Sequence, residues 1–236
     1  MNSNSKIKRG TPELILALDV DTFDRAKYFV DKLYPKIKIF KVGSQIFTAC
    51  GPGIVEFIHK KRAVVFLDLK FYDIPNTVAN AVRQAVRLGV KMLTLHISGG
   101  KEMLAAAVDA AKKEAVLSKV KKPILVGVTV LTSQETNSEE VLRLAKFGLE
   151  CGLDGVVCSV REASCLRQTI DKKFNIVTPG IRPDTKLKDD QKRVATVKDA
   201  ISAGSDFLVI GRPILEAEDP ISAAQEYLED ILKAQV

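Results

Sequence analysis

Short apolar runs rich in β-branched residues recur along the whole chain, and each is followed by a longer segment with helical periodicity. Apolar runs of this length, bounded by polar turn residues, are typical of buried β-strands. The pattern predicts eight strands, at residues 13–19, 37–43, 63–69, 91–97, 123–130, 154–158, 174–178 and 206–210.

The segments between these strands carry apolar residues at helical spacing. Residues 22–34 and 44–61 are two examples. The clearest is 75–88, where one apolar face is formed by Val78, Val82, Ala85 and Val86. Gly89 follows, and glycine commonly ends a helix, so the pattern predicts a helix that stops there.

Alternation of eight strands with helices predicts an α/β protein with a parallel sheet. A count of eight favours closure into a single (β/α)8 TIM barrel. An open doubly wound sheet is the alternative, but no Gly-x-Gly-x-x-Gly sequence follows the first strand. No Pro/Gly/Ser-rich linker divides the chain, so we expect one barrel domain over residues 13–236, preceded by a flexible tail at 1–12.

The composition, 46% hydrophobic and 28% charged, fits a soluble globular protein. Of the net charge of +7, three charges come from Lys6, Lys8 and Arg9 in the expected tail. The other lysines are scattered without interleaved aromatic residues, which favours a solvated surface over a nucleic-acid site. The apolar runs are too short to span a membrane, and no apolar signal segment is present at the start. We therefore expect a cytoplasmic protein that binds neither nucleic acid nor membrane.

The cysteines give no indication of a metal site. No Cys-x-x-Cys pair occurs, and neither histidine stands at ligand spacing from a cysteine, so no zinc is expected. Without a secretion signal, reduced and mostly buried thiols are favoured over disulfides. The cysteines are Cys50, Cys151, Cys158 and Cys165.

Charged or titratable side chains stand at the carboxyl ends of the first four predicted strands. They are Asp19, Lys41, Asp68, Lys70 and His96. In (β/α)8 barrels, these ends form the face that carries the active site. Because strand side chains alternate between two faces, Asp68 and Lys70 should point the same way, above Val64 and Phe66.

An isolated Asp–Lys pair is often only a structural salt bridge. Burying Asp19, Lys41, Asp68 and Lys70 at one rim is costly unless they neutralise one another. A lysine among carboxylates keeps its proton, which makes Lys70 a candidate general acid or a stabiliser of a developing carbanion. A Schiff-base lysine needs the opposite surroundings. His96 fits a site residue or a hydrogen-bonded barrel histidine equally well, and we leave it outside the catalytic set.

The loops after the last two strands contain groups suited to a phosphate, and barrels commonly bind phosphate there. Gly211 and Arg212 offer a backbone N–H and a guanidinium. Arg182 and Gln191 flank a polar loop, residues 183–190, that is long enough to close over a ligand as a lid. Two ordinary turns with surface arginines are the alternative interpretation.

Several short sequences resemble the orotidine 5′-phosphate decarboxylase family. In order along the chain they are LALDV, KVG, DLKFYDIPNT, VTVLTS, TPGIRP, DDQKRVAT and IGRP. The resemblance runs from about residue 13 to the C-terminus, and its most specific part is the Asp-x-Lys-x-x-Asp-Ile-Pro-Asn-Thr sequence at 68–77. It implies a homodimeric (β/α)8 barrel that decarboxylates orotidine 5′-monophosphate (OMP) to UMP and CO2 in de novo pyrimidine biosynthesis, with no metal or organic cofactor.

The resemblance also implies a role for each matching residue. Asp19 and Lys41 would contact the ribose hydroxyls and hold the chain of charges. Asp68 would lie against the substrate carboxylate, and Lys70 would protonate C6 of the pyrimidine as CO2 leaves. The implied catalytic residues are Lys70, Asp68, Asp73 and Lys41.

Other matching residues would bind the substrate. Asp73, Ile74 and Thr77 would enter the active site of the partner subunit. Thr132 would hydrogen-bond the pyrimidine edge. The phosphate would be held under the lid by Arg182, Gln191, Gly211 and Arg212.

The chain departs from the family pattern at Tyr72, where histidine is frequent, and at Val197, where proline is frequent. The closest alternatives share the Asp-x-Lys-x-x-Asp core and need magnesium: the 3-keto-gulonate-6-phosphate decarboxylases and the hexulose-phosphate synthases. The Asp-Ile-Pro-Asn-Thr continuation and the Val-Leu-Thr-Ser sequence favour the nucleotide enzyme. A non-catalytic nucleotide-binding or nucleic-acid-binding barrel is an alternative of another class, and the complete set of charges argues against a protein that only binds nucleotides.

Overall fold

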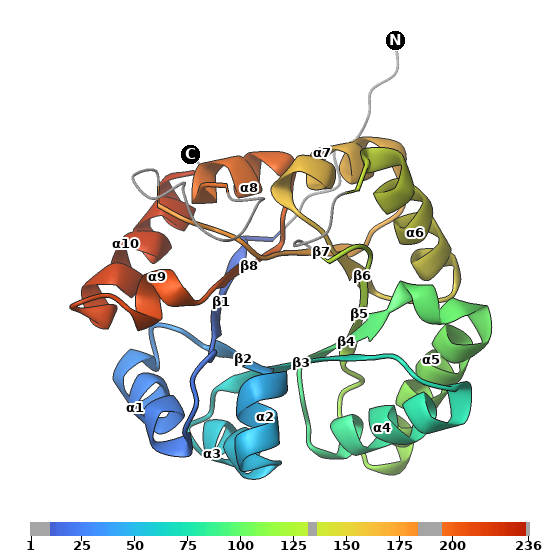
Figure 1. Cartoon of the computed structure of the whole chain (residues 1–236), viewed down its shortest axis with the longest axis horizontal. Coiled ribbons are helices and arrows are strands. Elements are labelled where there is room, and N and C mark those ends of the chain that lie inside the picture. Colours follow the sequence, from blue (N-terminus) through green and yellow to red (C-terminus); the bar gives the residue numbers. More distant parts are fainter. Residues whose placement is uncertain (1–9, 132–135, 184–194, 235–236) are drawn as a thin grey trace.

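The computed structural model describes residues 10–131, 136–183 and 195–234. Within these ranges, parallel strands form a closed barrel in the order β1 to β8, and helices surround it (Figure 1). The strands are β1 (Glu13–Ala17), β2 (Ile39–Gly43), β3 (Val64–Phe71), β4 (Met92–His96), β5 (Ile124–Val128), β6 (Gly155–Val157), β7 (Asn175–Thr178) and β8 (Phe207–Ile210). The predicted (β/α)8 TIM barrel is confirmed, and the strand ends differ from the predicted ones by at most two residues.

The helices follow the strands in sequence and form the outer layer of the barrel (Figure 1). They are α1 (Phe23–Leu33), α2 (Ser44–Cys50), α3 (Gly53–Lys60), α4 (Pro75–Arg87), η1 (Ile97–Gly99), α5 (Gly100–Leu117), α6 (Ser138–Glu150), α7 (Val160–Thr169), α8 (Val197–Ala203), α9 (Arg212–Leu215) and α10 (Pro220–Lys233). No helix in the described part of the chain is long and apolar enough to cross a membrane.

The segment 44–61, where the sequence predicted helical structure, contains two helices, α2 and α3. Gly51 ends α2 with a φ of +58°, a value that few residues other than glycine adopt readily. Its N–H donates to the carbonyl of Phe47. Pro52 then provides the N-cap of α3. A Gly-Pro pair commonly interrupts a helix. The helix therefore breaks here, although the spacing of apolar residues continues through the break.

Helix α4 follows the pattern predicted for it. Pro75 occupies the first turn, where its missing N–H leaves no helical hydrogen bond unmade. The predicted apolar face is buried, namely Val78, Val82, Ala85 and Val86. Gly89, just past the end of the helix, has a φ of +73°. Helix α4 begins at Pro75, shortly after β3 ends at Phe71. The residues between the strand and the helix lie close to the barrel mouth.

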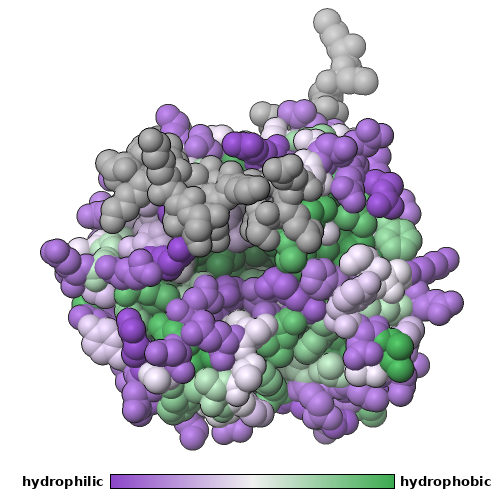
Figure 2. Space-filling view, viewed as in Figure 1, coloured by the Kyte–Doolittle hydropathy of each residue, from purple (hydrophilic) through white to green (hydrophobic). Residues whose placement is uncertain are grey.

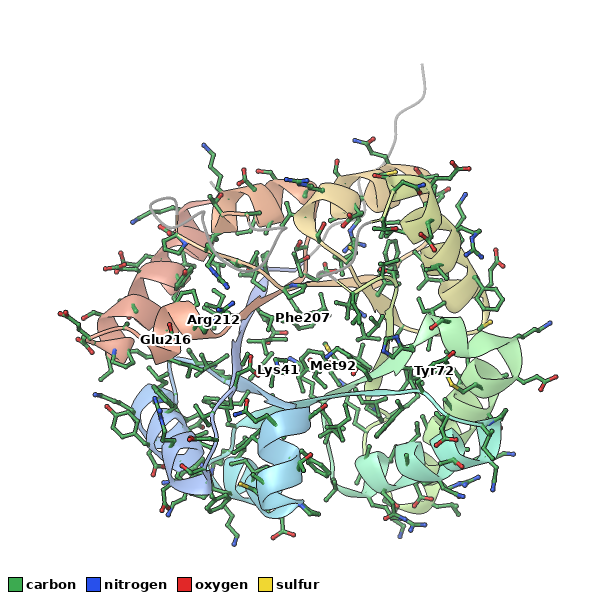
Figure 3. The ribbon with its side chains drawn as sticks, in the orientation of Figure 1. Lys41, Tyr72, Met92, Phe207, Arg212 and Glu216 are labelled. Atoms are coloured by element: carbon green, nitrogen blue, oxygen red, sulfur yellow. The ribbon has the colours of Figure 1, made fainter. Side chains whose placement is uncertain are left out.

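The strands contribute side chains to two apolar clusters, one on each face of the barrel. Side chains on the outer face of the barrel pack against the helices and form the larger cluster. The inner face is filled by a second cluster, made of Ile15, Ala17, Ile39, Phe66, Met92, Val126, Val177, Phe207 and Val209. Figure 3 shows Met92 and Phe207 within the ring of strands. Because this cluster fills the barrel interior, a ligand can be bound only at a mouth.

Candidate active site

A cavity lies at the carboxyl ends of the strands, above the inner apolar cluster. Seven of the residues predicted from the sequence line it: Asp19, Lys41, Asp68, Lys70, Arg182, Gly211 and Arg212. Its apolar wall includes Val128, Val157 and Val209. On the face seen in Figure 2, hydrophilic residues cross the centre between hydrophobic areas. A pocket of this kind, apolar with a few converging charges, is typical of small-molecule sites.

Lys41 links two carboxylates inside the cavity. Its Nζ lies 2.9 Å from Oδ1 of Asp19 and 3.6 Å from Oδ2 of Asp68. Lys41 is buried, and Figure 3 shows it within the ring of strands. Gly43 leaves the space for this arrangement, because a Cβ at that position would approach the Lys41 Nζ to 3.1 Å. Glycine in the Lys-Val-Gly sequence is therefore explained by the space that the Lys41 side chain needs.

Lys70 contacts the same carboxylate from the other side. Its Nζ lies 2.9 Å from both Oδ1 and Oδ2 of Asp68. Asp19, Lys41, Asp68 and Lys70 thus form a continuous row of alternating charges that sum to zero, as the sequence predicted. Neutralisation of this kind offsets the cost of removing the ions from water.

Asp68 and Lys70 meet through an irregular strand rather than through the simple alternation assumed from the sequence. In the pairing of β3 with β4, Leu67 lies opposite Leu93, but Phe71 lies opposite Leu95. Strand β3 therefore contains a bulge between these positions. Lys70 lies within it and has a φ of +50°, in the left-handed region. The side chains of Asp68 and Lys70 converge as expected, but strand alternation alone does not explain it, because the bulge also contributes.

Thr94, in the middle of β4, is a site residue that was not predicted from the sequence. Its hydroxyl accepts a hydrogen bond from the backbone N–H of Lys70 and donates one to Oδ1 of Asp68. The side chain is fully buried. The available signal was a polar residue within the apolar run of β4, two positions before His96.

The charges around Asp68 keep it ionised. Burial alone would raise the pKa of this carboxyl, but the ammonium groups of Lys41 and Lys70 and the hydrogen bonds from Lys70 and Thr94 outweigh burial. The net result is a pKa below the ordinary range. Asp68 is consequently a carboxylate at neutral pH, held between two cations.

His96 ends β4 and is half-buried, and it is not among the residues that line the cavity. Burial lowers its pKa, and the charge of Lys70 lowers it further, against an opposing effect of Asp68. Its ring lies 5.5 Å from that of Tyr72. The imidazole is thus neutral at physiological pH, and its position agrees with its exclusion from the catalytic set.

The two arginines predicted for the phosphate lie at the β7–β8 side of the cavity. Arg182 is buried, and its Nη1 donates to the carbonyl of Ile181. Arg212, labelled in Figure 3, begins α9 directly after Gly211. Both residues line the cavity. Two guanidinium groups at one end of a pocket are well suited to bind a dianion. Gln191 and Thr132 lie outside the described residues, as does most of the expected lid, 183–190.

Asp73, Ile74 and Thr77 do not line the cavity of their own chain. All three are exposed, between the end of β3 and the first turn of α4. Oδ1 of Asp73 accepts a hydrogen bond from the N–H of Ile74. Ile74 and the nearby Tyr72 are 66% and 63% exposed, high values for large hydrophobic side chains. These residues form an exposed, partly apolar edge beside the active-site mouth.

The cysteines and acidic residues show no metal-site geometry in the part of the chain that the structure describes. All four cysteines are free, and Cys158 is buried, which raises the pKa of its thiol. No three His, Cys, Asp or Glu side chains gather as metal ligands among the described residues. Both acidic residues of the cavity, Asp19 and Asp68, instead accept contacts from lysines.

Comparisons with known proteins place this geometry in context. The model of the orotidine 5′-phosphate decarboxylase / HUMPS family matches residues 12–227. An orotidine 5′-phosphate decarboxylase of Syntrophotalea carbinolica is 46% identical over 233 residues, which cover 94% of this chain and 96% of the relative. One of Saccharophagus degradans is 44% identical and covers 95% and 97%. The crystal structure of orotidine 5′-phosphate decarboxylase from Lactobacillus acidophilus superposes with a TM-score of 0.80 at 33% identity, covering 93% of this chain and 99% of that one.

Proposed function

The chain belongs to the orotidine 5′-phosphate decarboxylase / HUMPS family, and we propose that it decarboxylates OMP to UMP and CO2 by means of the row of charges in its cavity. One observation carries the mechanism: the Asp68 carboxylate lies between the ammonium groups of Lys41 and Lys70 at the cavity wall. The relatives at 44–46% identity that bear the name of this decarboxylase support the substrate.

Lys70 is the proton donor of the proposed reaction. The bond between C6 and the carboxylate carbon breaks, its electron pair stays on C6, and CO2 leaves. An N–H bond of the Lys70 ammonium then breaks, and the proton moves to C6, which gives UMP. Before that transfer, the positive charge stabilises the developing carbanion. The lysine recovers its proton from solvent.

Asp68 and Lys41 prepare Lys70 for this step. Asp68 is ionised because of its lysine neighbours, and as an ion it holds the Lys70 ammonium in place. In the proposed complex it also lies beside the substrate carboxylate, where two like charges repel until CO2 leaves. Lys41 balances Asp68 and Asp19, and both Lys41 and Asp19 would contact the ribose hydroxyls. No metal or organic cofactor takes part in the proposed mechanism.

The phosphate of OMP would bind at Arg182, Gly211 and Arg212, with Gln191, which flanks the expected lid. This phosphate is remote from C6, so its binding energy can assemble the charged site rather than act on the reacting bond. Thr132 would bind the pyrimidine edge. Arg182 and Arg212 line the same cavity as Lys70. This supports a substrate orientation with the phosphate at the arginines and C6 at Lys70.

We further propose a homodimer in which Asp73, Ile74 and Thr77 complete the active site of the partner subunit. Their exposure and their absence from the cavity of their own chain support this assignment. The exposed Tyr72 and Ile74 would then be covered by the partner. A dimer would explain why apolar side chains remain exposed beside the site.

A comparison of substrates tests the proposed function. The purified protein is offered OMP, its dephosphorylated nucleoside orotidine, and 3-keto-gulonate 6-phosphate with magnesium. Turnover of OMP and a loss of turnover, not only of affinity, with orotidine would support the proposal. Turnover of the sugar phosphate alone, dependent on magnesium, would replace it with the activity of the magnesium-dependent relatives.

A further inference from the structure

Thr94 contacts both members of the Lys70–Asp68 pair, although it does not line the cavity. It is 1% exposed and lies in β4, the strand next to β3. Its Oγ1 is 2.9 Å from the backbone N of Lys70 and 3.0 Å from Oδ1 of Asp68. One hydroxyl on a neighbouring strand therefore joins the main chain of the lysine to the side chain of the aspartate.

The bond to the main chain matters because β3 is irregular at this point. The register with β4 shifts between Leu67 and Phe71, and Lys70 has a φ of +50°. This left-handed conformation is unfavourable for a residue with a side chain and persists only where the surroundings hold it. The Lys70 N–H donates to the Thr94 hydroxyl, so a side chain of β4 stabilises the bulge.

The same hydroxyl also orients the carboxylate. A threonine hydroxyl has a single hydrogen to donate, and here it is directed to Asp68 while the oxygen accepts from Lys70. Oδ1 of Asp68 thus accepts from Thr94 and from the Lys70 ammonium, and Oδ2 faces both lysines. The rotation of the carboxylate is fixed by Thr94 and not by the lysines alone.

We propose that Thr94 is a positioning residue for the proposed decarboxylation: its hydroxyl sets the placement of the Lys70 ammonium against Asp68. This inference rests on the proposed function, since it concerns the geometry of the proposed proton donor. Thr94 does not line the cavity, so it acts through Lys70 and Asp68. Loss of its hydroxyl should affect the chemical step more than substrate binding.

Three variants separate this role from ordinary core packing. Thr94→Val keeps the shape and removes the hydroxyl, whereas Thr94→Ser keeps the hydroxyl. Thr178→Val is the matched control: Thr178 is equally buried in β7, and its hydroxyl bonds Ser205 and no charged residue of the cavity. We expect Thr94→Val to lower kcat for OMP by about 10- to 100-fold with KM near that of the wild type, because a misplaced catalytic group costs rate on this scale. Thr94→Ser and Thr178→Val should retain kcat.

Several outcomes would overturn the inference. A wild-type kcat in Thr94→Val, an equal loss in Thr94→Ser, or an equal loss in Thr178→Val would each reduce Thr94 to a packing residue. Should Thr94→Val not fold, Thr94→Ala takes its place in the comparison.

Crystal structures of the wild type and Thr94→Val provide a test that needs no activity. We expect Lys70 to leave the left-handed region, or its Nζ to move away from Asp68, in the variant. An unchanged Lys70 would refute the inference even if the wild type were active on OMP. A displaced Lys70 in a protein inactive on OMP would refute the proposed function and leave the structural role of Thr94 intact.

Discussion

The ammonium nitrogen of Lys70 lies 2.9 Å from each carboxylate oxygen of Asp68, and the lysine reaches this position from a left-handed backbone. The symmetric contact fixes the cation at the cavity wall, beside the place proposed for the substrate carboxylate. Because Asp68 also contacts Lys41, the position of Lys70 depends on the whole row of charges.

Replacement of the proposed proton donor should abolish the reaction. We expect Lys70→Ala to reduce the decarboxylation rate by at least about a thousandfold, since it removes both the acid and the charge that stabilises the carbanion. Circular dichroism should show an intact fold. Lys61→Ala is the control, because Lys61 forms an ion pair with Asp31 outside the cavity. Near-normal turnover by Lys70→Ala would contradict the assigned role.

The depressed pKa of Asp68 predicts a pH-dependent contribution to stability. A carboxyl whose folded-state pKa lies below its unfolded value stabilises the fold above the unfolded pKa, about 4. This contribution is lost as the pH falls through the folded-state pKa of Asp68. We expect Asp68→Asn to lower the free energy of unfolding at neutral pH, and the difference from the wild type to shrink in acid. Urea denaturation from pH 7 downward measures it, and a difference independent of pH would contradict the prediction.

Arg212 should act on binding rather than on the chemical step itself. We expect Arg212→Ala to weaken the affinity for UMP by about 2 kcal/mol, the scale of a hydrogen bond to a charged group. Arg161→Ala, which alters an exposed arginine of α7, is the control. Isothermal titration calorimetry with UMP and with uridine gives the direct readout. Equal losses for the nucleotide and the nucleoside would show that Arg212 does not bind the phosphate.

Subunit mixing tests the placement of Asp73. Lys70→Ala and Asp73→Ala homodimers should both be inactive, because each lacks one group in every site. If Asp73 serves the partner's site, a mixed dimer has one site with both groups intact. We therefore expect activity to return on mixing. Subunit exchange is followed with differently tagged variants, and no recovery after proven exchange would mean that Asp73 acts within its own chain or not at all.

The barrel could be predicted because eight apolar runs alternate with segments of helical periodicity. The inward placement of Lys41 and Asp68 could be predicted because strand side chains alternate between two faces. A strand that buries Ile39 on the barrel's inner face must also direct Lys41 inward, two residues later. The same alternation along β3 places Asp68 above Phe66. These positions lie in regular strands, and regular strands can be predicted from the spacing of hydrophobic residues.

The features that could not be predicted depend on irregular backbone or on another chain. The bulge at Lys70 is stabilised by Thr94, a contact between strands that no local pattern reveals. The break at Gly51 interrupts a segment whose apolar spacing continues through it. Asp73 lies beyond the strand and is exposed, so a single chain gives no physical reason for its place in a site. Only the resemblance to a family suggested its role.

The most direct test of the central claim is the decarboxylation of OMP by the purified, EDTA-treated protein, followed as the loss of the orotate absorbance. We expect continuous turnover that yields UMP and CO2 in equal amounts and does not change when magnesium is added. No turnover, or turnover that appears only after magnesium is added, would contradict it.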